Sequence, residues 1–314
     1  MLFERNAAGT PLADLVFVIA MARILEVVSS RLCSSGLLHV FDASGAGRYF
    51  ADEDCEDSIS FPENCSALKH VSYVDDLEVP VIGTASTVVS KLAAATVVVH
   101  DVFWQFGLDI NLAPGKTCAI IKLAGPGSKS ARLSLASDDF HIHCTSTFGR
   151  QFRLPIVQRY KHLGSTVTAE LSLAPELAIR GASMVQAIRP ISVKCFGSDD
   201  VPLKSKMTIV RSLVLSRGLY NCGTWHRPGI NEMRRIHTRV CSAYRSACSQ
   251  HFHQSPCRLT DQQFIDSRSL LAPYTHVRLA RLALSIRIAC KAPIELKRLL
   301  FACRDCNKSW LKAL

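Results

Sequence analysis

Apolar and polar residues follow two different periods along this chain, and the change of period divides it. From Leu12 to Leu32 the apolar residues recur at helical spacing, which predicts a buried helix. Val71 to Ile82 consists of two short apolar runs on either side of two aspartates, the pattern of a strand, a turn and a second strand. Thr84 to Phe106 returns to helical spacing. The N-terminal part therefore predicts a mixture of helices and strands.

Shorter signals continue this mixture to about residue 170. Further strands are predicted at Thr117–Leu123, in a hairpin of Leu133–Leu135 with Phe140–His143, and at Tyr160–Leu163. Residues 39–67 are rich in Asp, Glu, Ser and Gly and predict an acidic loop. From about Ala174 onward the signals are helical. We therefore expect an α+β fold with one domain over residues 1–170 and a helical domain over residues 171–314.

Composition indicates a globular protein. The 314 residues are 48% hydrophobic and 20% charged, as in a globular chain with a sizeable core. The most apolar run, Leu12 to Val28, contains Asp14, Arg23 and Glu26, so we expect no membrane segment. The N-terminus carries a charged pair at once and does not resemble a secretory signal. With no framework among the 13 cysteines, we expect reduced thiols and an intracellular location, cytoplasmic or nuclear.

Charge is distributed unevenly between the two parts. Residues 1–150 contain 11 Lys and Arg against 17 Asp and Glu, whereas residues 151–314 contain 26 against 9. A basic helical part joined to an acidic part suggests that a polyanion is held by the former. A basic protein with solvated side chains is the competing interpretation. The residues that we expect to contact nucleic acid are Lys204, Lys206, Arg211, Arg234, Arg235 and Arg239.

Asp75 and Asp76 are adjacent carboxylates within an apolar stretch. In a continuous strand their side chains would point to opposite faces, but at a tight hairpin turn both can reach one cation. Mg²⁺ prefers carboxylate oxygens and leaves positions for water and phosphate, which suits in-line phosphoryl transfer. From the pair alone, a solvent-exposed turn remains the competing interpretation, because Asp is a common turn residue.

Motifs elsewhere in the sequence favour the metal-binding interpretation of Asp75 and Asp76 over the solvent-exposed turn. Five stretches occur in the order found in reverse transcriptases, over about 225 residues. Motif B is resembled by AGTPLADLVFVIAMARIL (8–25), and motif C by YVDD (73–76). Motif D is resembled by FGLDINLAPGKT (106–117), and motif E by YKHLGSTVT (160–168). The fifth stretch, LYNCGTW (219–225), resembles a segment that follows the thumb helices. The chain as a whole resembles the palm and thumb part of the reverse transcriptases of LINE-like (non-LTR) retrotransposons.

The resemblance implies roles for individual residues. Asp75 and Asp76 would ligate Mg²⁺ (or Mn²⁺), and Lys116 would approach the triphosphate of the incoming dNTP. Gly9, Pro11, Leu12 and Tyr73 would lie at the template and the nucleotide, and Tyr160, Leu163 and Gly164 would form the primer grip. The implied partners are an RNA template, a DNA primer and a dNTP, and the implied fold is a partial polymerase palm followed by a helical thumb.

The sequence also departs from the family pattern. Motif B usually reads Gln-Gly-Asp-Pro-Leu, but here Ala8 and Thr10 replace the glutamine and the aspartate. Only eight residues precede Gly9, so motif A, with its metal-binding aspartate, and the fingers are not seen. Two functions therefore stay open. The chain is a fragment of an RNA-directed DNA polymerase that is inactive alone, or it is a non-catalytic nucleic-acid-binding remnant of a retroelement.

Cysteine and histidine residues near the C-terminus raise the question of a zinc site. Cys303-x-x-Cys306 is half of a zinc motif, and His251, His253 and Cys257 offer further ligands, but nothing in their spacing requires a metal. Thiols and imidazoles on a helical surface are the preferred interpretation.

Overall fold

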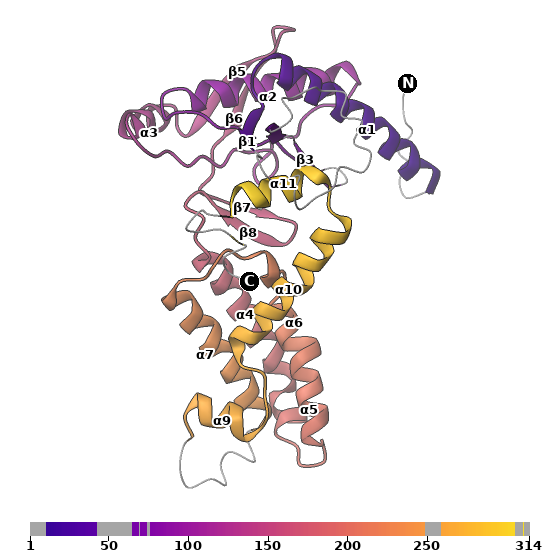
Figure 1. Cartoon of the computed structure of the whole chain (residues 1–314), viewed down its shortest axis with the longest axis vertical. Coiled ribbons are helices and arrows are strands. Elements are labelled where there is room, and N and C mark those ends of the chain that lie inside the picture. The colour runs from indigo at the N-terminus through magenta and orange to yellow at the C-terminus, as the bar shows by residue number, and fades with distance from the viewer. Residues whose placement is uncertain are drawn as a thin grey trace. The chain divides into compact units, whose positions relative to one another are not determined.

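The computed structural model describes residues 11–42, 65–68, 70–73, 76–248, 259–304 and 310, with side chains from residue 15 onward. Its helices and small antiparallel sheets confirm a mixed α and β composition (Figure 1). The chain divides into two compact units, Met1–Tyr160 and Lys161–Leu314. Each unit has its own hydrophobic core.

Two long helices organise the first unit, and both were predicted. Helix α1 spans Pro11–Ser34 and helix α2 spans Val88–Gln105. Ile24, Val28 and Leu32 repeat on one face of α1 and are fully or almost fully buried. They form a cluster with Ala95 and Val102 of α2. The second half of α1 is therefore its packing face against α2, whereas Leu15 and Ile19, which belong to the predicted spacing, are 57% and 62% exposed, so the prediction of a buried helix is wrong for the first half.

The strands of the first unit are short and form separate ribbons. The ribbons are β1 (His39–Asp42) with β2 (Cys65–Leu68), β3 (Val71–Tyr73) with β4 (Asp76–Glu78), and β5 (His141–Thr145) with β6 (Gln151–Pro155), each antiparallel. Strand β7 (Arg159–His162) pairs with β8 (Ser165–Thr168) where the two units meet in sequence. Among the described strands, each sheet has only two members, so the single larger palm sheet that we expected is not present.

Two strand predictions in this unit are wrong. Among the described residues, 117–123 form one isolated β-bridge, between Ala119 and Ile156. Continuing that parallel ladder toward Thr117 would require an N–H from Pro155, which has none. Leu133–Leu135 lies in helix α3 (Ser128–Ser137), because Ala131 and Leu135, four residues apart, pack into a core. In the sequence, Leu133 and Leu135 alternate with a polar residue as in a strand, but Leu133 is exposed in the structure.

Helix α2 also packs on the β5–β6 ribbon. Ile142, Cys144 and Leu154 of the ribbon form a core with residues of α2 and α3. At the end of α2, the buried Asp101 accepts hydrogen bonds from the Thr147 amide at 2.9 Å and from the Thr147 hydroxyl at 2.6 Å. The adjacent His100 ring contacts the same carboxylate at 2.8 Å. Asp101 thus fastens α2 to the turn between β5 and β6.

The second unit is helical, as predicted from Ala174 onward. Its main helices are α4 (Ala174–Ile191), α5 (Leu203–Ile209), α6 (Ser216–Gly218), α7 (Ile230–Ala247), α9 (Asp261–Ser267), α10 (Pro273–Lys291) and α11 (Ile294–Ala302). Two π-helical turns, η2 (Ser192–Phe196) and η3 (Val210–Leu215), follow α4 and α5, and a 3₁₀ turn, η4 (Cys222–Thr224), follows α6. Val210, Val214, Val240, Tyr244 and Val277 are buried at its centre.

Residues 161–170 belong to this helical unit, although the sequence predicted the division at residue 170. The reason is local bonding. The Thr166 amide donates to Glu176 of α4, and the Tyr220 hydroxyl donates to the Leu163 carbonyl. These bonds attach the turn between β7 and β8 to the helices.

Of the helices that the structure describes, none combines the length and the apolar character needed to cross a membrane.

The Asp101–Thr147 contact leads to a pH-dependent prediction. Burial raises the pKa of Asp101, but the hydrogen bonds from Thr147 and His100 outweigh it, so the pKa lies below the ordinary value of 3.8. A depressed folded-state pKa contributes stability above the unfolded-state pKa, and that contribution is lost as the pH falls through the folded-state pKa. Thr147→Val should therefore lower the free energy of unfolding at pH 7 by about 1.5 kcal/mol.

The deficit of Thr147→Val should shrink as the pH falls below 3.8 and through the lower folded-state pKa, at which Asp101 becomes protonated in the folded protein. Urea unfolding at a series of pH values measures it. Thr145→Val, on the same ribbon, is the control and should stay within about 0.5 kcal/mol of the parent at every pH. A deficit that does not depend on pH would contradict the role of the Asp101 charge.

Candidate nucleic-acid interface

Tyr73 and Asp76, the first and last residues of the Tyr-Val-Asp-Asp stretch, lie on the β3–β4 ribbon. Tyr73 is the register partner of Asp76, and both residues are exposed. Residues directly opposite each other in an antiparallel pair share a face of the sheet. Glu78, two residues along β4, projects on the same side as Asp76. Two carboxylates and a tyrosine therefore lie on one face of a hairpin.

Tyr160 lies in the same acidic environment. Burial raises the pKa of Tyr160, and the negative charges of Cys118, Asp76 and Glu78 raise it further, because they disfavour a phenolate nearby. The first residue of the motif E-like stretch is therefore within electrostatic reach of the motif C-like hairpin. The sequence assigned Tyr160 to the primer grip and Asp76 to the metal site, and no hydrogen bond joins these two residues in the part of the chain that the structure describes.

Several predicted site residues are not brought into this group. Lys116 is exposed in the loop after Gly115, and within the described residues no ion pair joins it to Asp76. Pro11 and Leu12 are the first residues of helix α1, where a proline is well tolerated. Asp75 and Gly9 lie outside the described residues.

The predicted primer-grip turn is held rigidly within the second unit. Leu163 and Gly164 both have left-handed backbone conformations, with φ of 44° and 79°. The Tyr220 hydroxyl donates to the Leu163 carbonyl at 3.3 Å, and the Asn221 amide donates to the Ser165 hydroxyl at 3.1 Å. A β-carbon at Gly164 would meet the Tyr220 ring at 3.3 Å. The LYNCGTW stretch thus packs directly against the motif E-like turn.

A buried ion pair supports the same turn from α4. Glu176 is 1% exposed, and its carboxylate accepts from the Arg180 Nε at 2.6 Å and from the Thr166 amide at 2.8 Å. The Arg180 Nη2 donates to the Gly164 carbonyl, and the guanidinium lies 4.7 Å from the centre of the Tyr220 ring. Sequence reasoning did not single out Glu176 and Arg180, although their separation of four residues on a predicted helix was a signal for an ion pair.

Three arginines surround a small pocket beside this pair. Arg180, Arg235 and Arg239 line it together with apolar side chains, among them Leu177, Met184 and Trp225. Arg235 and Arg239 are exposed and one turn apart on α7. The pocket is too small for a sugar or a base, so only the exposed guanidinium groups of Arg235 and Arg239 are available to a phosphate.

The predicted basic residues differ in accessibility. Lys204, Arg211, Arg234, Arg235 and Arg239 are exposed, as contact with nucleic acid requires. The prediction for Lys206 is wrong. Its side chain is 3% exposed, and its ammonium group donates to the Phe196 carbonyl at 2.9 Å, so it stabilises the fold and cannot face a phosphate.

Comparison of the chain with protein-family models, with curated proteins and with solved structures finds no match. Any function must therefore be argued from the residues and their geometry.

The pocket arginines give a prediction for binding. Arg235→Ala with Arg239→Ala should weaken binding to single-stranded RNA or DNA and reduce the slope of log affinity against log salt by about 1 per residue. Fluorescence anisotropy across a salt series measures both quantities. Arg278→Ala with Arg287→Ala removes the same charge from exposed positions on α10 and is the matched control. Equal losses in the two double variants would show that only net charge matters.

The Glu176–Arg180 pair gives a prediction for stability. Glu176→Gln leaves the Arg180 guanidinium without its buried anionic partner, so the free energy of unfolding should fall by about 3–5 kcal/mol. The exposed pair of Arg23 and Glu26 is the control, and Glu26→Gln should cost less than about 1 kcal/mol. Urea unfolding of the two variants checks the difference. Similar small losses would mean that the buried pair does not support the turn.

Proposed function

We propose that this chain contains part of the palm and thumb of an RNA-directed DNA polymerase of the LINE-like retrotransposon class. The proposal rests first on five motif-like stretches in the family's order. The strongest support for this proposal comes from the structure. Tyr73 and Asp76 of the Tyr-Val-Asp-Asp stretch are paired across a hairpin, and Tyr160 of the motif E-like stretch lies near the same carboxylates.

The acidic face of the β3–β4 ribbon fits a hard divalent cation. Asp76 and Glu78 are exposed oxygen donors on one side of β4, and Mg²⁺ or Mn²⁺ prefers such ligands. Asp75 would add a further carboxylate. When bound, the metal ions would stabilise charge on the attacking and leaving oxygens of nucleotidyl transfer. In this proposal Tyr73 contacts the end of the primer, and Lys116 contacts the triphosphate of the dNTP.

The second unit would hold the primer and the template. The Leu163–Gly164 turn is locked by Arg180 and Tyr220, so a strand end placed on it would meet a rigid surface. Arg235 and Arg239 would contact phosphates beside it. These contacts position a nucleic acid without reading its sequence, so we expect weak sequence preference.

A non-catalytic nucleic-acid-binding protein derived from a retroelement is the second candidate. The replacement of the motif B glutamine and aspartate by Ala8 and Thr10 favours it. Both candidates bind nucleic acid through the second unit. Only the first has carboxylates that take part in polymerisation.

Primer extension separates the two candidates. Nucleotidyl transfer needs metal ligands on both sides of the reacting phosphate, and residues 1–314 show no match to motif A, which supplies one of them in the resembling family. We therefore expect residues 1–314 alone to bind a primed RNA template but not to extend the primer. Joining a fingers and motif A segment from a LINE-like reverse transcriptase should produce Mg²⁺-dependent extension.

In that joined protein, Asp75→Asn should abolish extension without changing template binding. Asp138→Asn, in another adjacent pair of aspartates, is the control and should have no effect. A joined protein that binds the template but never extends the primer would favour the non-catalytic candidate, and extension that survives Asp75→Asn would contradict the role of Asp75 as a metal ligand.

A further inference from the structure

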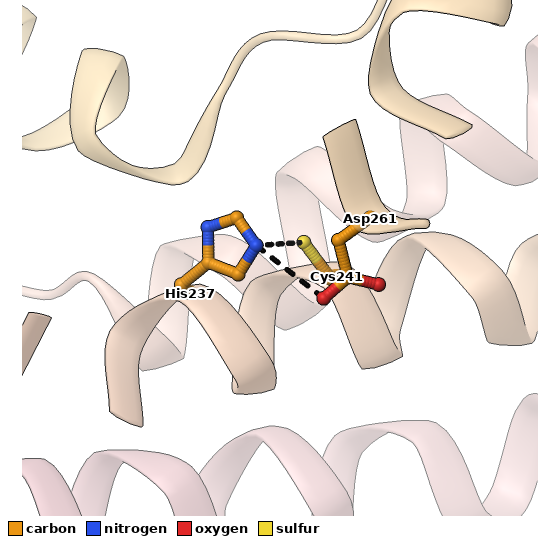
Figure 2. A group of neighbouring side chains, drawn as sticks. All are labelled: His237, Cys241 and Asp261. Atoms are coloured by element: carbon orange, nitrogen blue, oxygen red, sulfur yellow. Dashed lines mark hydrogen bonds and ion pairs between the residues drawn. The ribbon is translucent and has the colours of Figure 1, made fainter. Parts of the chain in front are cut away.

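Three metal-ligating side chains of different types converge beside helix α7. His237 and Cys241 lie one turn apart on α7, and Asp261 is the first residue of α9 (Figure 2). The His237 Nε2 is 3.5 Å from the Cys241 sulfur and 3.3 Å from the Asp261 Oδ2. All three ligand atoms lie within 4.8 Å of one another.

We propose that His237, Cys241 and Asp261 bind one divalent transition-metal ion of the Zn²⁺ type. Zinc bonds of about 2.3 Å to sulfur, about 2.0–2.1 Å to nitrogen and about 2.0–2.2 Å to oxygen imply definite ligand spacings. At tetrahedral angles they place sulfur and nitrogen about 3.5 Å apart, and nitrogen and oxygen about 3.3 Å apart. Both spacings match the observed ones.

Without a metal the three side chains can also form a hydrogen-bonded triad, in which the Cys241 thiol and the His237 ring both bond the Asp261 carboxylate. One nitrogen, the His237 Nε2, faces both the thiol and the carboxylate (Figure 2). In neutral imidazole that nitrogen carries either one proton or one lone pair, so it makes one good hydrogen bond rather than two. A cation at the common centre is bonded to all three ligands. The sulfur, nitrogen and oxygen set favours Zn²⁺, Co²⁺ or Ni²⁺ over Mg²⁺ and Ca²⁺.

Arg245 orients the carboxylate. Its Nε and Nη2 donate to the Asp261 Oδ1 at 3.1 and 2.7 Å, and Nη2 also donates to the Leu259 carbonyl at 3.0 Å. The other oxygen, Oδ2, is thereby turned toward His237. Such outer contacts are a regular feature of metal sites. The guanidinium charge opposes a cation, but the thiolate and the carboxylate supply two negative charges.

The site is open to solvent on one side. Cys241 is buried, whereas the side chains of His237 and Asp261 are 40% and 39% exposed. Three protein ligands leave a fourth tetrahedral position for water or a small anion. On binding, the sulfur–hydrogen bond of Cys241 breaks, and the proton passes to solvent while the sulfur keeps the electron pair and bonds the metal.

The metal would link the middle of α7 to the start of α9. The chain between these two points would then form a closed loop. This inference does not depend on the proposed polymerase function, because it rests on residues that neither candidate function uses. Sequence reasoning missed the cluster and considered Cys303 and Cys306 instead. Cys303 is exposed at the end of α11, and Cys306, His251, His253 and Cys257 lie outside the described residues.

Titration of the metal-free full-length chain with Co²⁺ tests the proposal. We expect a thiolate-to-cobalt charge-transfer band, together with the visible bands of a tetrahedral ion, and displacement of Co²⁺ by one equivalent of Zn²⁺. Cys241→Ser should remove the charge-transfer band, and His237→Gln should remove the tetrahedral bands. Arg245→Met should retain the bands but bind Zn²⁺ about 10–100-fold more weakly.

The controls locate the metal. Cys248→Ser, buried near the end of the same helix, should retain every band, and so should Cys303→Ser. If Cys241→Ser unfolds, Asp261→Asn gives a second measurement, since Zn²⁺ should raise the melting temperature of the parent chain but not of this variant. The absence of a band in the parent chain, or bands that survive Cys241→Ser but vanish in Cys303→Ser, would overturn the proposal.

Discussion

The buried ion pair between Glu176 and Arg180 is the interaction on which the second unit depends. A carboxylate with 1% exposure is stable only when its oxygens are bonded, and here Arg180 and the Thr166 amide bond them. Because Arg180 also reaches the Gly164 carbonyl, the same pair attaches a β-turn to a helix. The candidate grip, its supporting tyrosine and the arginine-lined pocket all follow from that attachment.

Helix α7 places two kinds of chemistry on two faces. Arg235 and Arg239 form one stripe and line the pocket, whereas His237 and Cys241 form another, about 200° around the helix axis. At the start of α7, Glu232 accepts from the Gly229 amide at 2.8 Å and from the Leu173 amide at 3.1 Å. That carboxylate fixes the rotation of α7 relative to α4, so the arginine stripe faces the pocket and the metal-ligating stripe faces α9.

Patterns with a single local cause were predicted well. The apolar face in the second half of α1, the Asp-Asp hairpin and the start of the helical part at Ala174 depend on residues close in sequence. The failures have long-range causes. Pro155 stops the pairing of residues 117–123, although it lies far along the chain, and Ala131 and Leu135 form a helix because a core receives that face. Lys206 was expected to contact nucleic acid because it lies in the basic part of the chain, but its ammonium group is buried and donates to the Phe196 carbonyl.

The sequence by itself determined the mixed composition, the division between an acidic part and a basic part, and the motif series that resembles a reverse transcriptase. These properties are sums or short spacings along the chain, so they need no coordinates. The tertiary structure alone decided which side chains meet. Arg180 with Tyr220, and Asp261 with His237 and Cys241, are each separated by 20 or more residues. Such contacts depend on how helices and ribbons pack, because packing brings distant residues within bonding distance, and no local pattern encodes that distance.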